Sequence, residues 1–493
     1  MTKYAEVAVD APAGYDRTFT YSVPSGVSVL PGHLVEVPFG PRVLSGVVFH
    51  LSDESYVGAT REITRVAYSE PVLSPENRSL AKWISDYYMA PLFDCASLMI
   101  SPGHALRAKN YIFLNNSAAA GQFTQSQGRV MSYLNANGKI KRETFTRAMG
   151  SGMENALNSL IREGVVGASS EWRKSRVSSK YVAYLDLACS YTSAEEIAKA
   201  LVRRAPNQAA LLRSICKYGT SIKLSDAHKE FGASATKRLE VQGLILRTYI
   251  RVDRDPLDGK AFSQDTPPTL TEKQRFCIQE IESAVKASES RVFLLHGVTG
   301  SGKTEIYLQA LKHVLNKGNR GIVMVPELSL TSQTIERFGR RFPGQVAVLH
   351  SGLSRGEHFD QWSGIQQGNY GVVIGSRSAI FAPQQKLGII IIDEEHEWTY
   401  KQQDGTPHYN AKDVAIKLAE LTNAVVILGS ATPEVVSYSR ALKGTYSLLE
   451  LPDRIGSRVV QNYPTRQPLA EVKVVDLRQE LREGNRSIFS RLL

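Results

Sequence analysis

Apolar residues follow two different patterns along the chain. Residues 1–103 contain short valine- and tyrosine-rich runs, RTFTYSV, HLVEVPF and VLSGVVFHL, which are separated by PSG, PG and FGP turns. Such runs predict the strands of a small β-barrel or sandwich. After residue 290, apolar runs such as RVFLLHG, GIVMVPE, GIIIIDEE and AVVILGS recur between helical segments. Uninterrupted apolar strands are buried on both faces, so we expect a parallel sheet flanked by helices.

The middle of the chain is predicted to be largely helical. The segment SPENRSLAKWISDYYMAP predicts a helix with Ser74 as its N-cap and Pro75 in its first turn. Residues 125–170 and 207–254 resemble each other, since each has an apolar helix, a glycine turn, a short helix and a last helix before an apolar strand. This order resembles a winged helix used twice, a fold that serves in DNA binding about as often as in protein docking.

The charge of the chain favours a polyanionic partner. Its 493 residues carry a net charge of +11, with a pI of about 9.3. Basic side chains release counterions from phosphate backbones, although the same charge can serve solubility alone. The four cysteines form no C-x-x-C pair, no run of ~20 apolar residues predicts a transmembrane helix, and the N-terminus has no apolar signal core. We therefore expect a reducing cytoplasmic location and no membrane partner.

A glycine-rich loop follows the apolar run RVFLL. Its sequence GVTGSGKT matches the phosphate-binding pattern G-x-x-x-x-G-K-[ST] and precedes a predicted helix. Lys303 is expected to reach the β- and γ-phosphates of ATP, and Thr304 to hold Mg²⁺. The alternative is a chance glycine turn. The cofactor-binding residues predicted in this loop are Gly297, Val298, Thr299, Gly300, Ser301, Gly302, Lys303 and Thr304.

An acidic cluster follows four isoleucines in IIIIDEEHE. The apolar run places Asp393 at the carboxyl end of a buried strand, which is the edge where α/β proteins bind ligands. Asp393 is expected to hold Mg²⁺ through water, and Glu394 to orient and deprotonate the attacking water. Glu395 and His396 are assigned to the same nucleotide site, and Gln274 in LTEKQ is expected to read adenine. The alternative for the acidic cluster is a surface turn.

Further short motifs indicate the class of ATP-using protein. MVPELSLTSQ, IGSRSAIF and GSATP occur in this order after the glycine-rich loop and resemble the first half of a superfamily 2 helicase. In such a protein ATP drives movement along a nucleic acid strand, or its opening. The stretches GVTGSGKTEIYL, VLHSGLS, GSRSAIFAP, IIIIDEEHEWTYKQQDG and ILGSATP more closely resemble the primosomal protein N′ (PriA) family, as does RTFTYSVP…PGHLVEVPFG near the N-terminus.

This resemblance implies a function in replication restart. The family recognises stalled forks, unwinds the lagging-strand arm 3′ to 5′ with ATP and Mg²⁺, and loads the primosome. The implied partners are forked and single-stranded DNA, primosome proteins and single-strand-binding protein. The N-terminal module of the family holds a DNA 3′ end, and the matching positions are Phe19, Thr20, Gly40 and Arg61. A carboxylate is common where Thr20 stands; threonine can bond a 3′-hydroxyl, but without the charge-assisted contact.

The segment EWTYKQQDGTPHYNAKD resembles the aromatic-rich loop that links DNA binding to hydrolysis in this family. Aromatic rings there are expected to stack on bases, each with about 1–3 kcal/mol, and basic side chains to meet phosphates. The family usually has His and Arg where Asn410 and Lys412 stand, and lysine gives no bidentate contact. The alternative is an ordinary polar loop. The DNA-binding residues predicted in and beside this loop are Arg377, Trp398, Tyr400, Lys401, Tyr409 and Lys412.

The prediction is a multidomain α/β protein of five segments. They are a β-rich 3′-end DNA-binding domain (1–103), a winged-helix-like domain (104–175), a second such region with a linker (176–262), a RecA-like first helicase lobe (263–465) and the start of a second lobe (466–493). The family continues with the rest of that lobe and a cysteine-rich zinc module, so the chain is expected to be C-terminally truncated, to lack the family's zinc site, and to bind forks without unwinding them. Two alternatives stay open: another superfamily 2 translocase, and a non-motor DNA-end scaffold that senses ATP.

Overall fold

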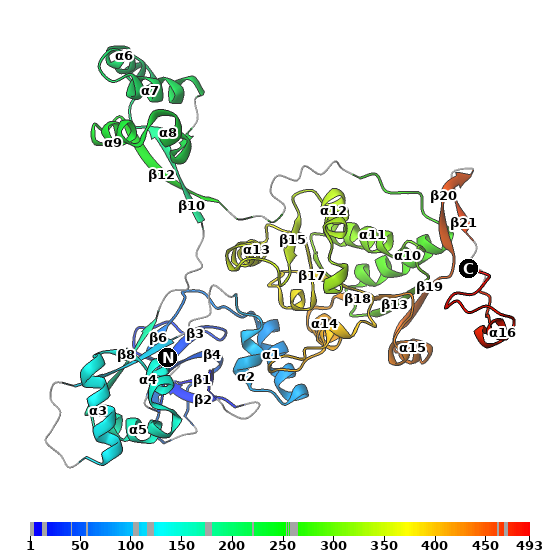
Figure 1. Cartoon of the computed structure of the whole chain (residues 1–493), viewed down its shortest axis with the longest axis horizontal. Helices are drawn as coiled ribbons and strands as arrows, with labels where there is room; N and C mark the ends of the chain where they lie inside the picture. The colour runs from blue at the N-terminus through cyan, green and yellow to red at the C-terminus, as the bar shows by residue number, and fades with distance from the viewer. Residues whose placement is uncertain are drawn as a thin grey trace.

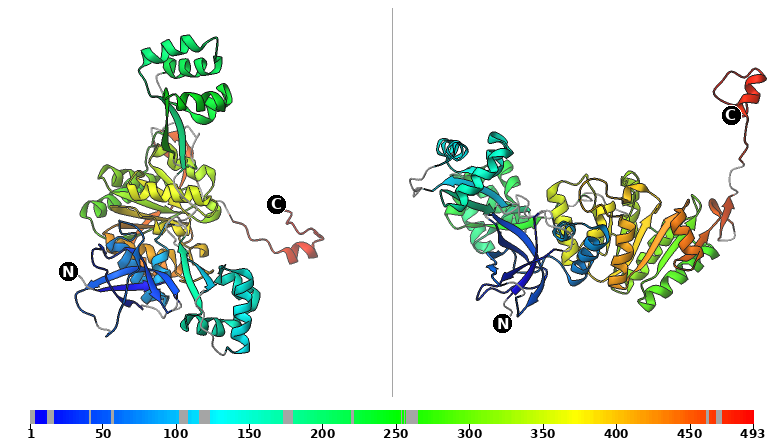
Figure 2. Two further views of the ribbon diagram at one scale, coloured as in Figure 1. Left: turned by 90° about the vertical axis from the view of Figure 1, so that its left-hand side faces the viewer. Right: turned by 90° about the horizontal axis from the view of Figure 1, so that it is seen from below.

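The computed structural model describes residues 4–11, 17–40, 42–55, 58–101, 108–115, 123–172, 180–218, 221–252, 254, 256, 265–460, 463–467 and 472–493. Figure 1 shows a β-rich N-terminal module, two small mixed units and a parallel-sheet lobe that follow one another along the chain. The second mixed unit stands away from the other parts, whereas the helices of the N-terminal module lie against the lobe (Figures 1 and 2). Every helix among the described residues is too short or too polar to cross a membrane.

A six-stranded sheet forms the N-terminal module, in the order β5-β2-β1-β4-β3-β6. Its strands are β1 (Tyr4–Val9), β2 (Phe19–Ser22), β3 (Leu34–Phe39), β4 (Arg42–Ser52), β5 (Arg61–Glu62) and β6 (Arg65–Val66). The three predicted runs form β2, β3 and β4. The sequence prediction omits β1, although this strand lies centrally and pairs with both β2 and β4. Its alternate residues Ala5 and Val7 enter the core with Val35, Val37 and Val48.

Helices α1 (Pro75–Tyr88) and α2 (Leu92–Ser97) complete the module. The hydroxyl of Ser74 accepts a hydrogen bond from the backbone N–H of Asn77 at 3.2 Å, so the predicted N-cap is confirmed. Leu80 and Ile84 of α1 belong to the same apolar core as residues of the parallel-sheet lobe. The N-terminal module is therefore joined to the lobe through buried apolar surface.

Two units of similar layout lie between the module and the lobe. The first contains β7 (Ala108–Leu114), α3 (Gln125–Asn137), β8 (Ile140–Lys141), α4 (Arg142–Met149), η1 (Ser151–Met153), α5 (Glu154–Arg162) and β9 (Val166–Trp172). The second contains β10 (Lys180–Leu187), α6 (Tyr191–Leu201), α7 (Pro206–Tyr218), β11 (Ile222–Lys223), α8 (Leu224–Phe231), α9 (Ala233–Val241) and β12 (Ile245–Val252). Each has a three-stranded sheet with its long first strand in the middle. The order of helices and the last strand follow the repeated sequence pattern, whereas the first strands β7 and β10 precede the two repeats and are not predicted.

The lobe is built on a seven-stranded sheet in the order β15-β16-β14-β17-β18-β13-β19. Its strands are β13 (Val292–Gly297), β14 (Arg320–Met324), β15 (Val346–Leu349), β16 (Val372–Gly375), β17 (Leu387–Asp393), β18 (Val425–Ser430) and β19 (Ser447–Leu451). All neighbouring pairs are parallel. The prediction of a parallel sheet is therefore confirmed.

Helices cover both faces of this sheet. One face packs on α10 (Glu272–Ala287), α11 (Lys303–Asn316) and α12 (Ser332–Arg341), and the other on α13 (Arg355–Gln367), α14 (Ala411–Thr422) and α1 of the N-terminal module. In β17, Ile389 and Ile391 face the first set of helices, whereas Ile390 and Ile392 face the second. Burial on both faces explains the uninterrupted apolar run. Helix α15 (Val435–Leu442) connects β18 to β19. The hairpin of β20 (Arg454–Val460) and β21 (Tyr463–Gln467), and then α16 (Leu477–Arg482), follow β19.

The central strand generates a stability prediction. We expect Ile391→Ala to lower the free energy of unfolding of the lobe by about 2–5 kcal/mol, because it leaves a cavity in a close-packed core. Urea unfolding followed by circular dichroism measures the change. The matched control is Val474→Ala, at a side chain that is 96% exposed, where we expect a change within about 0.5 kcal/mol. Equal effects of the two substitutions would contradict the packing described.

Candidate functional site

Three loops that carry the predicted chemistry leave the same edge of the sheet. Strands β17, β18 and β13 are neighbours and parallel, so their carboxyl ends lie together. The register pairs Asp393 at the end of β17 with Gly429, and pairs Ser430 at the end of β18 with His296 of β13. The acidic cluster, the GSATP turn and the glycine-rich loop are thereby brought side by side.

The glycine-rich loop is shaped by Gln274. The side-chain amide of Gln274 donates to the carbonyl of Ser301 at 3.0 Å, and its oxygen accepts from the backbone N–H of Thr271 at 3.0 Å. Gly302 has a φ of +86°, and a Cβ at this position would lie 2.4 Å from the same amide nitrogen, so glycine is required there. Gln274 is buried and holds the loop. Both polar atoms of this amide have partners within the chain, and the predicted recognition of adenine by Gln274 stays a prediction.

The loop has the features of an anion site. Helix α11 begins at Lys303, directly after the loop, so the first backbone N–H groups of the helix can donate to an anion held by the loop. Within the described residues, the buried hydroxyl of Ser301 has no hydrogen-bond partner. The ammonium of Lys303 donates to the carbonyl of Gly297 at 2.8 Å, within the loop that would hold the phosphates.

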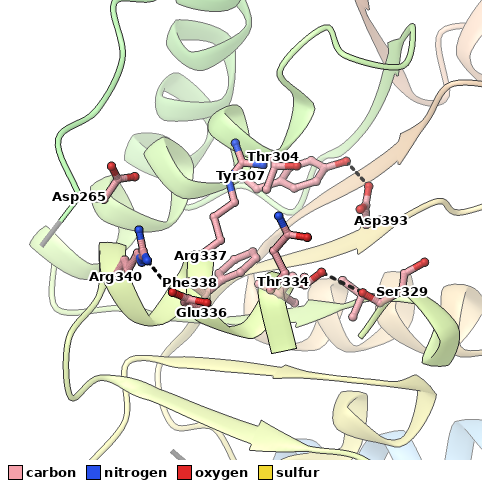
Figure 3. Close-up of a pocket in the computed structure, with 13 residues that line it drawn as sticks. Asp265, Thr304, Tyr307, Ser329, Thr334, Glu336, Arg337, Phe338, Arg340 and Asp393 are labelled. Atoms are coloured by element: carbon pink, nitrogen blue, oxygen red, sulfur yellow. Dashed lines mark hydrogen bonds and ion pairs between the residues drawn. The ribbon is translucent and has the colours of Figure 1, made fainter. Parts of the chain in front are cut away.

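Asp393 is held in a half-buried position beside this loop. Its Oδ1 accepts a hydrogen bond from the hydroxyl of Tyr307 at 2.9 Å, and its backbone carbonyl accepts one from the hydroxyl of Tyr400 at 2.7 Å. Burial raises the pKa of Asp393, while the Tyr307 hydrogen bond and the charge of Lys303 act in the opposite direction. Figure 3 shows Thr304, Tyr307 and Asp393 on the wall of one cavity of about 620 Å³.

Glu394 adopts an unusual backbone conformation for its residue type. Its φ is +47°, in the left-handed region, which non-glycine residues enter at a cost and often at functional positions. Burial and the neighbouring Asp393 raise the pKa of Glu394. A carboxylate with a raised pKa is a better proton acceptor, as a general base requires.

These residues fit Mg²⁺ and a nucleotide. Oxygen donors are what Mg²⁺ prefers, and Thr304 and Asp393 supply a hydroxyl and a carboxylate on one cavity wall. The unpartnered Ser301 hydroxyl, the N-terminus of α11 and Lys303 supply groups for phosphate oxygens. The chemistry of the ion, when bound, is to offset the negative charge of the phosphates.

Glu395 and His396, the last two residues of the acidic cluster, contact neighbouring loops. His396 Nδ1 lies 2.8 Å from the hydroxyl of Ser430, and the N–H of Thr432 donates to this hydroxyl at 3.0 Å. This contact links the acidic cluster to the GSATP turn. Glu395 turns away: its carboxylate accepts from the N–H of Glu434 at 2.8 Å and from Lys412. The assignment of Glu395 to nucleotide binding is therefore wrong, because its side chain is buried on α14 and α15 instead.

Three predicted DNA contacts in the aromatic-rich loop are corrected by their burial. Tyr400 and Tyr409 are only 2% and 3% exposed, so their rings pack inside the lobe and cannot stack on bases in this arrangement. Lys412 is 6% exposed, and its ammonium contacts Glu395 at 2.8 Å and also pairs with Glu434. Burial alone would lower the pKa of Lys412, but its hydrogen bonds to Glu395 and Glu434 raise it. Tyr400 and Lys412 support the acidic cluster through Asp393 and Glu395, whereas Tyr409 packs edge to face on Phe381.

The remaining predicted residues of this loop stay accessible. Trp398, in the short helix η4 (Trp398–Tyr400), is 68% exposed, and Lys401 is exposed beside it. Arg377, in η3 (Arg377–Phe381), donates to the carbonyls of Thr399 at 3.3 Å and Lys401 at 2.9 Å. The contacts of Trp398, Lys401 and Arg377 with DNA stay predictions.

A tyrosine of the N-terminal module anchors the end of the loop. The hydroxyl of Tyr88 on α1 accepts from the N–H of Asn410 at 3.0 Å and donates to Asp413 at 3.1 Å. The ammonium of Lys401 lies 5.1 Å from the centre of the Tyr88 ring. Figure 1 shows α1 beside α14. The module and the loop are thus in direct contact.

The positions predicted to hold a DNA 3′ end form two groups in the N-terminal module. Arg61 donates to the carbonyl of Gly40 at 2.7 Å, and the Phe19 ring meets Phe39 edge to face at 5.1 Å. The hydroxyl of Thr20 makes a separate contact, since it donates to Glu6 at 2.6 Å. Their role in DNA binding stays a prediction.

The sequence does not predict the roles of the two tyrosines whose hydroxyl groups hold Asp393 and the start of α14 in place. Tyr307 stands in the helix predicted after the glycine-rich loop, on an apolar face where the sequence alone gives it no polar partner, yet its hydroxyl donates to Asp393. Tyr88 and Asp413 lie 325 positions apart, and no local pattern pairs them. One feature of the sequence could have indicated the role of Tyr307. A tyrosine on the apolar face of a helix is expected to be buried, and the hydroxyl of a buried tyrosine usually has a hydrogen-bond partner.

Comparisons with known proteins agree with this geometry. The family model of the PriA 3′ DNA-binding domain matches residues 6–101, and the model of the type III restriction enzyme res subunit matches residues 268–435. Replication restart protein PriA of Bacillus subtilis (strain 168) is 39% identical over 99% of this chain, and that of Synechocystis is 34% identical over 99%. The chain is a PriA-family protein. It spans 59% and 58% of the length of these two relatives.

Other relatives extend the same result. Replication restart protein PriA of Chlamydia muridarum is 30% identical over 98% of this chain and 55% of that protein. Among solved structures, RecG bound to a three-way DNA junction is 26% identical, and the match covers 38% of this chain and 24% of the RecG chain. Its TM-score of 0.30 is too low to support inferences about this chain.

The burial of Lys412 generates a prediction that separates support from DNA contact. We expect Lys412→Met to lower the free energy of unfolding of the lobe by about 3–5 kcal/mol, because it leaves Glu395 buried without its cation. The dependence of DNA affinity on salt should keep its slope. In the exposed control Lys401→Met, stability should change much less and the slope of log affinity against log salt should fall by about 1. The reverse pattern would restore Lys412 to the DNA surface.

Proposed function

We propose that this chain is the DNA-binding part and the ATP-binding lobe of an ATP-dependent 3′–5′ DNA helicase that acts in replication restart. The observation that carries the proposal is the joining of two parts. A phosphate loop and an acidic cluster share one sheet edge, and the lobe that holds them shares a core with a module of the 3′ DNA-binding family. Such a chain is suited to couple a DNA end to the state of a nucleotide.

The residues of the lobe have distinct tasks in this proposal. Lys303, Ser301 and the N-terminus of α11 bind the phosphates, and Thr304 and Asp393 hold Mg²⁺. Tyr307 keeps the carboxylate of Asp393 in place through its hydrogen bond. Glu394 accepts the proton of the attacking water, for which its raised pKa suits it. His396 and Ser430 connect this site to the GSATP turn.

The partners follow from the family and the charge. Stalled forks and single-stranded DNA are the proposed substrates, and the net charge of +11 supports contacts with phosphates. Primosome proteins and single-strand-binding protein are proposed partners, since the PriA relatives are named for replication restart. Trp398, Lys401 and Arg377 are the proposed strand contacts of the lobe.

A substitution in the phosphate loop tests the nucleotide site. We expect Lys303→Ala to weaken binding of Mg²⁺–ATP by at least about tenfold, because a buried cation beside the phosphates is lost. DNA affinity should stay unchanged, since the DNA contacts lie elsewhere. Titration calorimetry with Mg²⁺–ATP and fluorescence anisotropy with a forked DNA measure the two affinities. Lys312→Ala, on the exposed side of the same helix, is the control, and equal nucleotide affinity of both variants would reject the site.

A second test addresses recognition of the DNA end. We expect the chain to bind a strand with a 3′-hydroxyl up to about tenfold more tightly than the same strand with a 3′-phosphate. Binding of both should weaken steeply with salt, because phosphate contacts release counterions. Anisotropy titrations over a range of salt concentrations measure both effects. If the two ends bind equally at every salt concentration, the chain does not recognise 3′ ends.

A further inference from the structure

The family commonly has a carboxylate where Thr20 stands, and in this chain the carboxylate of Glu6 lies next to Thr20 instead. Glu6 lies in the central strand β1 and is the cross-strand partner of Thr20 in β2. Its Oε1 accepts from the hydroxyl of Thr20 at 2.6 Å, and its Oε2 accepts from the hydroxyl of Thr18 at 2.8 Å. Each carboxylate oxygen therefore has one hydroxyl donor, and the two threonines hold the negative charge in a fixed place.

This arrangement changes what the Thr20 hydroxyl can bind. Because its proton is donated to Glu6, the oxygen of Thr20 is left as an acceptor for any further partner. Donation to a carboxylate also polarises the hydroxyl and strengthens it as an acceptor. A DNA 3′-hydroxyl is a donor that fits this acceptor, whereas a 3′-phosphate brings negative charge close to Glu6 and is repelled.

The basic residue predicted to hold a DNA 3′ end, Arg61, lies on the next strand. Arg61 of β5 is the register partner of Tyr21, which follows Thr20 in β2. Its guanidinium is exposed and tied to Gly40 by the bond to the carbonyl. Successive residues of a strand point to opposite faces of a sheet, so this register groups Arg61 with Tyr21 and not with the Glu6–Thr20 contact. The discrimination between DNA ends that is inferred here therefore depends on Glu6 and Thr20 alone.

We propose that Glu6 is a specificity-determining residue that selects DNA 3′ ends carrying a hydroxyl, acting through Thr20. This inference rests on the proposed binding of 3′ ends and names the group that distinguishes them. The hydroxyl oxygen of Thr20 then contacts the DNA 3′-hydroxyl, and Glu6 supplies the negative charge that threonine lacks. The pair replaces a single acidic side chain by a carboxylate and a hydroxyl from two neighbouring strands.

The experiment compares two DNA ends across four proteins. Fluorescent single strands of one sequence, with a 3′-hydroxyl or a 3′-phosphate, are titrated by anisotropy with the full chain. The variants are Glu6→Gln, which keeps the shape and can still bond both threonines; Thr20→Val, which removes the acceptor; and Glu70→Gln, a control at an exposed carboxylate of the same module. Circular dichroism confirms that each variant is folded.

We expect Glu6→Gln to reduce the preference for the hydroxyl end by about three- to fivefold, mainly through tighter binding of the phosphate end. Thr20→Val should reduce the preference through weaker binding of the hydroxyl end. Glu70→Gln should change both affinities equally and leave the ratio as in the wild type. The effect of Glu6→Gln should diminish at high salt, because charge repulsion is screened.

Two contrary results have different meanings. If the wild type binds both ends equally, binding of 3′ ends is rejected and this inference falls with it. If the wild type prefers the hydroxyl end and Glu6→Gln keeps the full preference, end recognition stands and the role of Glu6 is rejected. A preference that Glu70→Gln reduces as much as Glu6→Gln also overturns the role, because the effect then reflects net charge alone.

Discussion

The parallel register of strands β17, β18 and β13 is the constraint on which the nucleotide site depends. Parallel strands deliver all their carboxyl ends to one edge, and the order of this sheet makes the three strands neighbours. Four isoleucines before Asp393 are buried on both faces, so the position of the carboxylate is set by packing on two sides. A shift of one residue in β17 would turn every side chain to the opposite face and remove Asp393 from Tyr307.

A second dependence connects the site to the N-terminal module. The lobe face that carries α14 is completed by α1, and the two parts share one apolar core. Tyr88 adds two hydrogen bonds at the start of α14. At the other end of the aromatic-rich loop, Tyr400 bonds the carbonyl of Asp393. The loop therefore lies between the N-terminal module and Asp393, and its two ends are held by hydrogen bonds of Tyr88 and of Tyr400.

Local chemistry made some features predictable from the sequence and left others hidden. The phosphate loop, Asp393 with Glu394 and the Ser74 cap each depend on a few consecutive residues, and the structure has them where they are expected. The buried roles of Tyr400, Tyr409, Lys412 and Glu395 depend on partners in other elements. An aromatic, basic or acidic side chain reads the same in a sequence whether it faces solvent or a distant partner. The burial of these four side chains therefore could not be predicted from the sequence.

The most direct test of this account locates the metal–nucleotide complex on the chain. Mn²⁺ replaces Mg²⁺ in the complex with ATP, and its unpaired electrons broaden methyl resonances of nearby Ile, Leu and Val residues in nuclear magnetic resonance spectra. The account predicts the strongest broadening at Val298 in the phosphate loop and Ile392 before Asp393, with Val474 unaffected. Broadening centred on another part of the chain, with Val298 and Ile392 unchanged, would contradict a nucleotide site at the shared edge of the sheet.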